Sequence, residues 1–507
     1  MKSHTGKQLV VRGFVGRFLA AGLLTAGLLG GTVGAALAAK DSLTLGMVLE
    51  PPHLDPTAGA AAAIDEVVYA NIFEGLTRID RSGAVKPALA ESWTVSDDGL
   101  TYTFKLHEGV SYHDGSDFDS ADVKFSLERA MAEDSTNAQK GLFAPIASVE
   151  APDASTVVIT LKQPAGNFLF NLGWGDAVIV APESAAENKN HPIGTGPFIF
   201  DRWVKGDRIE MSRNPDYWGK AAGLAKATIK IIPDPAAATA ALLAGDVDAF
   251  ANFPAPEALG QFEGDSRFKV VIGTTEGETI LAMNNAAAAL KDIRVRRALA
   301  HAIDRKAVID GAMFGYGTPI GSHFAPHHPA YVDLTGHYAY DPEKAMALLA
   351  EAGYGGGLTL SLKLPPPSYA RRSGEVIASQ LAAVGVRTEI VQVEWAQWLE
   401  QVFKGRDYDL TVVSHTEPMD IGIYARDDYY FNYDDAGFKA LMAKLDATLD
   451  GAERNGLLAE AQEKLAEDSV NVFLFQFAKP GVWNKDVVGL WENSPVQAND
   501  LTEVNWK

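Results

Sequence analysis

The chain contains no cysteine, and this absence excludes several kinds of site. Without cysteine it can form no disulfide, no thiolate metal site and no cysteine nucleophile, and it offers no N-terminal cysteine for a lipid anchor. With 507 residues, of which 47% are hydrophobic, it is too apolar for disorder and too long for one ordinary core. We therefore expect a folded protein of two or three lobes, held together by its own cores.

Long apolar runs are also missing after the N-terminus. No later segment approaches the run of about 20 apolar residues that a membrane-spanning helix needs. The first 38 residues instead show a basic start, the apolar segment FLAAGLLTAGLLG and the small-residue site Ala36-Leu37-Ala38, a pattern typical of a secretory signal peptide. The sequence predicts that residues 1–38 are removed. The mature protein, beginning near Ala39, should then be periplasmic, without a membrane anchor and not a lipoprotein.

Basic residues are few relative to acidic ones. Lysine and arginine number 44 against 65 aspartates and glutamates, which gives a formal net charge of −21. Loss of the four basic residues in the signal peptide would take this charge to −25. A chain with this excess of negative charge repels nucleic acids and anionic lipid surfaces, so we expect no nucleic-acid partner.

What the sequence does contain is alternating strand and helix patterns, which predict an α/β protein. The segment SLTLGMVL (42–49) has the pattern of a strand, and a helix is expected around 61–76. Beyond it, LTYTFKL and STVVITL alternate apolar and polar residues, and Asp98-Gly99 is a strong hairpin signal. These patterns predict a β-rich subdomain at about 81–193.

The stretch YHDGSDFDSADVKFSLER (112–129) has the composition of a metal or acid/base site. Its acids do not follow the register of a calcium loop, which needs alternating oxygen ligands and a terminal glutamate. Asp119 can instead cap a helix, with Asp122 at the third helical position, and His113-Asp114-Gly115 can form the turn before it. We interpret the stretch as a junction between a hairpin and a helix.

The same stretch, with its pattern HDG…F…A.DV..S..R, resembles the peptide/nickel-type extracytoplasmic solute-binding proteins, which deliver ligands to ABC importers. Four further blocks resemble the family in the same order along the chain: GTGPF (194–198), NPDYWG (214–219), LLAGDVDAF (242–250) and DIRVRRALAHAIDR (292–305). Structural roles account for their residue types: a Gly-Pro turn, Tyr217-Trp218 as a core plug, and Arg294, Arg296 and Arg297 as a solvated helix face.

The resemblance implies a type II clamp of two lobes, with the β-rich subdomain on the first. Segments 274–285 and 472–483 resemble the two crossing segments of the hinge. The expected organisation is a first lobe at 39–279, a second lobe at 280–475 and a return to the first lobe at 476–507. The resemblance also implies a monomer that captures a peptide or other amine-bearing, possibly cationic, small solute and delivers it to the permease subunits of an ABC importer.

The second lobe carries the predicted site. LTLSLKL, RTEIVQV and DLTVV (409–413) read as strands of a parallel sheet, and ligands gather beyond the carboxyl ends of such strands. The loops to inspect are therefore PPPSY, EWAQW and SHTEPMD. We expect Trp395 to offer a flat apolar wall, and Glu417 and His415 to offer polar groups.

The resemblance adds a contrast in charge. In dipeptide- and oligopeptide-binding relatives an acid after the last of these strands holds the ligand's ammonium, and Glu417 occupies that position. The arginine that holds the carboxylate in the dipeptide branch would fall near Leu364, where this chain has none. Tyr424 and Asp420 follow in an acidic, aromatic segment that suits a cationic guest, although an ordinary aromatic core explains much of it equally well.

Other chemistries have weaker support. His323, His327 and His328, near His337, could hold nickel or zinc, but Pro326 and Pro329 favour a surface loop. A binder of a nickel complex or haem remains the alternative within the family. A secreted hydrolase is the alternative outside it, although no G-x-S-x-G, H-E-x-x-H or phosphate-loop motif is present. We expect a binding protein that is not an enzyme, with no cofactor and no bound metal.

Overall fold

The structure is a computed structural model, and it describes residues 40–59, 61–417, 419–449 and 451–507. The predicted signal peptide lies outside these residues. Among the described helices, none is both long and apolar enough to cross a membrane.

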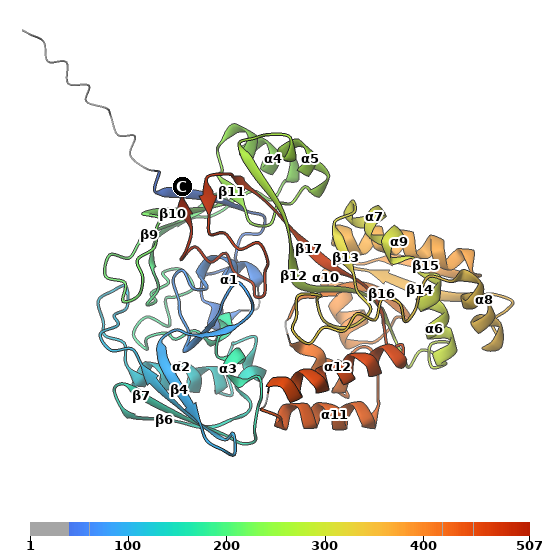
Figure 1. The fold of residues 1–507 in the computed structure, drawn as a ribbon, viewed down its shortest axis with the longest axis horizontal. Helices are drawn as coiled ribbons and strands as arrows, with labels where there is room; N and C mark the ends of the chain where they lie inside the picture. Colours follow the sequence, from blue (N-terminus) through green and yellow to red (C-terminus); the bar gives the residue numbers. More distant parts are fainter. Residues whose placement is uncertain (1–39, 60, 418, 450) are drawn as a thin grey trace, which may run out of the picture. The chain divides into compact units, whose positions relative to one another are not determined.

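One large mixed sheet runs through the described chain (Figure 1). Its two longest strands, β12 and β17, pair antiparallel side by side in the middle of the sheet and join its two halves. We call the half with β1 and β8–β11, together with the smaller sheets that follow β1, the first lobe, and the half with β14–β16 the second lobe. In spatial order the strands are β15 (Val386–Gln392), β14 (Leu358–Leu364), β16 (Leu410–His415), β12 (Phe268–Met283), β17 (Val472–Asn484), β11 (Ala249–Phe250), β1 (Ser42–Met47), β10 (Lys226–Ile231), β9 (Arg208–Arg213) and β8 (Phe198–Val204), with β13 (Gly317–Pro319) also paired to β17.

The first lobe is built around β1, which pairs parallel with β10 and β11. The predicted strand at 42–49 is therefore confirmed. The helix expected around 61–76 is much shorter, because α1 spans only Ala62–Val68 and Tyr69 is already extended. Two more helices, α4 (Pro235–Ala244) and α5 (Leu259–Glu263), pack with the Phe250 side of the sheet in a separate apolar cluster.

A second sheet in the first lobe forms the β-rich subdomain. Its strands are β4 (Ala90–Val95), β5 (Thr101–Leu106), β7 (Thr156–Leu161) and β6 (Ile146–Asp153), in that order and all antiparallel. The hairpin at Asp98-Gly99 is confirmed, with Gly99 at φ +69°. Alternation puts Tyr102 and Phe104 of β5 and Val157 of β7 into one buried cluster. Short ladders β2 (Thr77–Ile79) with β3 (Val85–Pro87) and β18 (Val487–Val488) with β19 (Asn505–Trp506) complete the sheets.

The acid-rich stretch is the predicted junction. Helix α2 (Ser120–Met131) begins after Asp119, whose side chain accepts a hydrogen bond from the Ala121 N–H at 2.7 Å, while Asp122 accepts from the Asp119 N–H at 2.9 Å. Both halves of a capping box are thus present. His113 and Gly115, which has φ +86°, form the turn before it.

The second lobe confirms the predicted alternation of strands and helices. β14 pairs parallel with both β15 and β16, and β16 pairs antiparallel with β12. The helix predicted before Gly385 is α9, Ser368–Ala383. The remaining helices are α3 (Phe168–Asn171) in the first lobe and α6 (Ile293–Ala302), α7 (Arg305–Met313), α8 (Pro342–Glu351), α10 (Trp395–Trp398), α11 (Ala436–Ala447) and α12 (Gly451–Glu467) in the second.

One of the expected structural roles is wrong. Arg296 is buried rather than solvated, because its guanidinium donates to backbone carbonyls of Leu290 and Ser469. The expected core plug has a second role: Trp218 packs against the apolar cluster of the β-rich subdomain, and the half-buried Tyr217 and Trp218 also donate hydrogen bonds to the carboxylate of buried Glu74, at 2.7 and 2.9 Å. Buried polar groups need such partners, and the local residue pattern does not show which ones they find.

Candidate functional site

A cavity of about 540 Å³ is lined by residues of both lobes. Its volume lies within the range of small-molecule sites, about 300 to 1,000 Å³. From the first lobe the lining residues are Gln139, Leu142, Asn167, Phe170, Asn171 and Trp174, and from the second Trp395, Trp398, Leu399, Phe403, Val413, Ser414, His415, Glu417, Met419, Asp420, Ile423, Arg426, Tyr429 and Tyr430.

The second-lobe wall is placed by the ends of two strands. β15 ends at Gln392, and α10 begins three residues later with Trp395; β16 ends at His415, and the chain then passes through Glu417 to the 3₁₀ turn Asp420–Ala425. The carboxyl ends of neighbouring parallel strands meet at one sheet edge, which brings these residues together. The loop after β14, PPPSY, does not line the cavity.

Four of the five predicted site residues line this cavity. Glu417 is exposed, and from the described residues its Oε2 accepts a hydrogen bond only from the neighbouring Thr416 N–H at 3.2 Å, so its carboxylate has acceptor capacity to spare. Trp395 is 42% exposed and stands edge-on against Trp398, with 5.5 Å between ring centroids. The structure therefore places an acid and a flat aromatic face in one cavity.

Tyr424, the fifth, lies behind the cavity wall. Its side chain is buried, stacks on Phe431 and accepts a hydrogen bond from the Asn471 side chain at 3.2 Å. The aromatic faces that do reach the cavity from this segment are those of Tyr429 and Tyr430.

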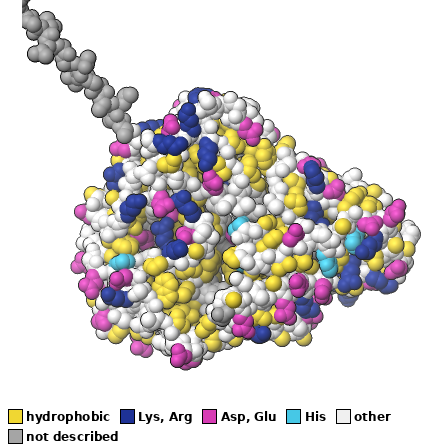
Figure 2. Space-filling view, in the orientation of Figure 1, with side chains coloured by type: hydrophobic (Ala, Val, Ile, Leu, Met, Phe, Trp, Pro, Cys, Tyr) yellow, Lys and Arg dark blue, Asp and Glu magenta, His cyan; other side chains and the backbone are white. Residues whose placement is uncertain are grey.

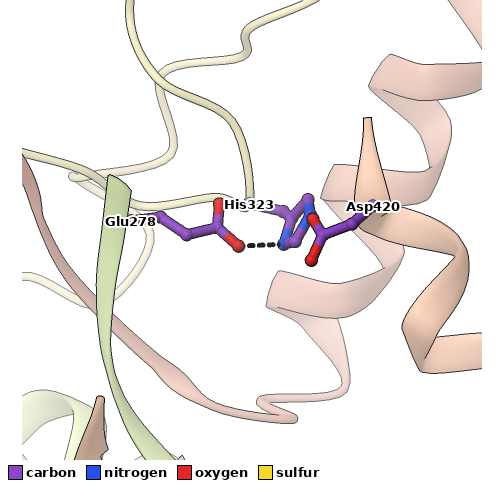
Figure 3. Close-up of side chains that lie close together, drawn as sticks. All are labelled: Glu278, His323 and Asp420. Carbon is purple, nitrogen blue, oxygen red and sulfur yellow. Dashed lines mark hydrogen bonds and ion pairs between the residues drawn. The ribbon is translucent and has the colours of Figure 1, made fainter. Parts of the chain in front are cut away.

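Under the cavity floor lies a buried histidine between two carboxylates (Figure 3). His323 Nδ1 is 2.5 Å from Glu278 Oε1, and Nε2 is 2.8 Å from Asp420 Oδ1. Only 1% of the His323 side chain is exposed. The expectation of a surface loop at His323 is thus wrong: the prolines do break any helix there, but the loop folds inward because two buried acids need a cation.

The charge of this histidine follows from its two partners. A neutral imidazole can donate from only one nitrogen, and an ionised carboxylate can only accept, so His323 must be an imidazolium when both carboxylates are ionised. Burial raises the pKa of Glu278 to about 7, so this partner is ionised only above neutral pH. Burial by itself lowers the pKa of His323, but Glu278 and Asp420 outweigh burial and raise it to about 10. Burial likewise raises the pKa of Asp420, but His323 and His415 reverse this and hold it well below its ordinary value.

The same geometry bears on metal binding. The two nitrogens of an imidazole ring point in diverging directions, so one ion could not be ligated by His323 and by both carboxylates in this arrangement (Figure 3). A second set, His415, Glu417 and Asp420, has ligand atoms within 4.8 Å of one another at the cavity itself and suits a divalent metal better.

The predicted group of histidines does not converge. His327 contacts Glu276 at 2.5 Å, His328 stacks on Phe324, and His337 stands edge-on to Tyr338. These contacts hold each of the three rings against a different partner.

Several cavity residues were missed from sequence. Phe170 of α3 and Trp174, three residues after α3 ends, form an aromatic wall on the first lobe, in a segment whose composition resembles any core segment. Arg426 also lines the cavity, with its guanidinium over the Tyr429 ring at 5.1 Å from the centroid. The carboxylate-binding arginine of the dipeptide branch would fall near Leu364, and the arginines nearest to that position, Arg371 and Arg372, do not line the cavity.

On the face drawn in Figure 2, acidic side chains are interspersed with basic and hydrophobic ones.

Comparisons with known proteins point the same way. Residues 84–436 match the family described as bacterial extracellular solute-binding proteins, family 5 Middle. The glutathione-binding protein GsiB of Escherichia coli O1:K1 / APEC is 34% identical over 358 residues, 69% of each chain. The periplasmic binding protein DppA from Helicobacter pylori, solved with the peptide STSA, has a TM-score of 0.80 at 26% identity, covering 92% of this chain and 98% of that one. NikZ from Campylobacter jejuni, solved with Ni(L-His), has a TM-score of 0.75 at 26% identity, covering 89% and 95%. The predicted two-lobe fold is confirmed.

Proposed function

Because the chain belongs to family 5 of the bacterial extracellular solute-binding proteins and is the solute-binding component of an ABC importer, we propose that its solute is a peptide or another small amine-bearing molecule. The observation that carries this proposal is the pairing of ionised acids with aromatic faces in one cavity. Glu417 and Asp420 supply negative charge, and Trp395 and Tyr429 supply flat surfaces on which a cation is stabilised.

Arg426 extends the proposal to both ends of such a ligand. It lines the same cavity as Glu417, so the cavity offers one group for an ammonium and one for a carboxylate. The absence of an arginine near Leu364 argued against a plain dipeptide. Arg426 lies at a different place from the carboxylate-binding arginine of the dipeptide-binding relatives. This favours a zwitterionic solute whose length or shape differs from that of a dipeptide.

Capture would work by closure of the two lobes. We place the first lobe at 39–279 with 476–507 and the second at 280–475, because β12 and β17 carry the chain between them. A ligand that contacts both walls of the cavity stabilises the closed form over the open one, and the permease then recognises the closed form.

The setting and partners proposed here are those of a periplasmic protein. Cleavage after residue 38 would release a chain without a lipid anchor, which acts as a monomer, meets the permease subunits of the importer and carries out no catalysis. The cysteine-free sequence supports the absence of a lipid anchor.

The test is to identify what binds the mature protein. Mass spectrometry of the protein purified without refolding would reveal a co-purified solute. Thermal shift assays would then compare glutathione, the peptide Ser-Thr-Ser-Ala and the same peptide with an acetylated N-terminus. We expect stabilisation by an amine-bearing ligand, loss of that stabilisation on acetylation, and no product. Equal stabilisation by free and acetylated peptide would contradict the amine anchor, and turnover of a bound ligand would contradict a pure binder.

A nickel complex is the second candidate, favoured by the set His415, Glu417 and Asp420. Calorimetry with Ni²⁺ and L-histidine together, and with each alone, would test it. Tight binding that requires both components would favour the metal complex over the amine-bearing solute.

A further inference from the structure

We propose that the solute carries a large apolar side chain, preferably an aromatic one, set apart from its ammonium group, and that an apolar subsite of the cavity recognises this side chain. The subsite is built from both lobes: Trp395 and Leu399 of the second, and Phe170 and Trp174 of the first. The inference rests on the proposed function, because it states what an amine-bearing peptide must carry besides its amine.

Two large apolar side chains of the second lobe are exposed within the cavity. Trp395 is 42% exposed and Leu399 is 46% exposed, and both line the cavity. They stand four residues apart, in α10 and at the start of the π-helical turn Leu399–Lys404 that continues it, so they share one face. π-helical turns are rare and occur frequently at functional sites. An apolar group of a ligand that covers this face displaces water favourably.

The rest of this helical segment does not share the exposure of its apolar residues. Trp398 is buried and donates from its indole N–H to Thr411 Oγ1 at 3.0 Å, and Val402 is buried as well. Of the described side chains from 394 to 404, the others that are exposed are polar: Glu394, Gln397, Glu400 and Lys404. Exposed apolar side chains that gather in one cavity mark a binding surface.

Contact between the lobes does not cover these two side chains. Arg454 of α12 already donates a hydrogen bond to the side chain of Asn167 in the first lobe, and Asn167 lines the cavity. With the lobes in contact there, Trp395 and Leu399 are still exposed. The cavity of about 540 Å³ therefore keeps room beside them for an apolar group of the solute.

The first lobe contributes apolar groups of its own to the cavity. Phe170 and Trp174 stand with their ring centroids 6.2 Å apart, and Leu142 and Phe170 pack against the same apolar cluster as Trp174. All three line the cavity. A further ring gains from edge-on or offset contact with such rings beyond the area that it buries. A solute side chain that contacts both lobes also favours their closure.

The apolar subsite and the acids lie apart along the sheet edge. Trp395 follows β15, whereas Glu417 and Asp420 follow β16, and β14 lies between these two strands. Two spacings between neighbouring strands amount to roughly 10 Å. An extended peptide advances about 3.3 to 3.6 Å per residue, so this separation corresponds to about three residues. A peptide whose ammonium lies at the acids therefore brings its third side chain to Leu399.

The experiment is a calorimetric titration of the mature chain with tetrapeptides that differ in the position of one phenylalanine. Ser-Thr-Phe-Ala should bind at least about tenfold more tightly than Ser-Thr-Ser-Ala, because its ring is removed from water in the apolar subsite. Phe-Thr-Ser-Ala is the matched control, with the same composition and charge. It places the ring beside the acids, so its affinity should stay within about threefold of that of Ser-Thr-Ser-Ala.

Leu399→Gln tests the protein side of the subsite. Leu399 offers only apolar contact, whereas the indole face of Trp395 also suits a cation. The variant should reduce the preference for Ser-Thr-Phe-Ala over Ser-Thr-Ser-Ala from at least about tenfold to less than about threefold. Leu49→Gln, which changes an exposed leucine outside the cavity lining, should keep the full preference. Because both leucines are exposed, both variants should unfold close to the wild-type temperature.

Three outcomes would overturn the proposal: equal affinity for the three peptides, binding of none of them, or an unchanged preference in Leu399→Gln. Failure of the proposed function gives a different result. If acetylated Ser-Thr-Phe-Ala binds as tightly as the free peptide, and more tightly than acetylated Ser-Thr-Ser-Ala, the amine anchor is wrong and the apolar subsite stands. If glutathione stabilises the protein but phenylalanine adds no affinity, the amine-bearing solute stands and the apolar subsite is wrong.

Discussion

Glu417 is the residue whose charge distinguishes an amine-binding cavity from an aromatic pocket of another kind. In a closed, water-poor cleft a ligand cation that loses its carboxylate partner is left buried and unpaired. Glu417→Gln should therefore cost about 2 to 5 kcal/mol of affinity for an amine-bearing ligand, a weakening of at least tenfold, measured by calorimetric titration. Glu400→Gln, an exposed acid that does not line the cavity, is the control and should change little. Wild-type affinity in Glu417→Gln would leave Glu417 as a loop residue.

His113 has a structural role that is equally testable. Its Nδ1 accepts from the Gly194 N–H at 3.3 Å, so Nε2 carries the proton and donates to the Gly196 carbonyl at 2.9 Å. His113→Ala leaves the Gly194 N–H without its partner, while the Gly196 carbonyl still accepts from the Asn214 side chain at 3.2 Å. The substitution should cost about 1 to 3 kcal/mol of stability, with ligand affinity unchanged. Lost affinity at unchanged stability would contradict this role.

The pH dependence of this variant has a definite sign. Burial lowers the pKa of His113 below its ordinary value, so the folded protein binds fewer protons at this ring than the unfolded chain does. Stability contributed by His113 is therefore present above pH 6.5 and declines as pH falls below it. The stability difference between wild type and His113→Ala, measured by chemical denaturation, should be smaller at pH 5 than at pH 7.

At the scale of elements, the start of α2 explains why an acid-rich stretch need not be a site. Asp119 is half of a capping box, and its loss should destabilise the protein by about 1 kcal/mol in Asp119→Ala. Asp117→Ala, an exposed acid two residues earlier, should stay within about 0.5 kcal/mol of the wild type. Calorimetric unfolding of the three proteins compares them directly, and equal losses in both variants would contradict the capping role.

At the scale of the whole molecule, the lobes have a connection besides the crossing strands. Arg454 of α12 is buried and donates to two carbonyls at the end of α11 and to the side chain of Asn167 in the first lobe, which lines the cavity. The Gly166 N–H donates to the Asp446 carbonyl at 3.3 Å beside it. In Figure 1 this is where α12 lies next to α3. These contacts should hold the lobes together independently of any ligand.

Because the chain has no cysteine of its own, two introduced cysteines can be labelled specifically to test whether this connection holds the lobes together. Spin labels on Glu128→Cys and Glu463→Cys, both exposed and in different lobes, would report the distance between the lobes without background labelling. Asn167→Ala removes a hydrogen bond to a charged group, worth about 1.5 to 3 kcal/mol, so the population should shift at least tenfold toward longer distances. Asn167→Asp should pair with Arg454 and favour shorter ones, and Asn171→Ala, another cavity residue, should do neither. Identical distributions in all three would mean that the connection does not hold the lobes.

The sequence by itself determined the features that depend on local pattern. Neighbouring residues set the alternation in β5, the cap at Asp119, the hairpin at Gly99 and the strand ends just before Trp395 and at His415. These features could therefore be predicted without any knowledge of the fold. The sequence blocks that resemble the solute-binding family, in the family's order along the chain, also predicted the two-lobe architecture.

Only the tertiary structure decided which polar groups meet. Glu278, His323 and Asp420 lie up to 142 positions apart in the sequence, and no local pattern marks their encounter. The same holds for Arg296 and its carbonyls and for Arg426 at the cavity. Burial makes such partners obligatory, because a charge removed from water must be paired or hydrogen-bonded, but the identity of the partner is fixed only when distant strands and loops come together.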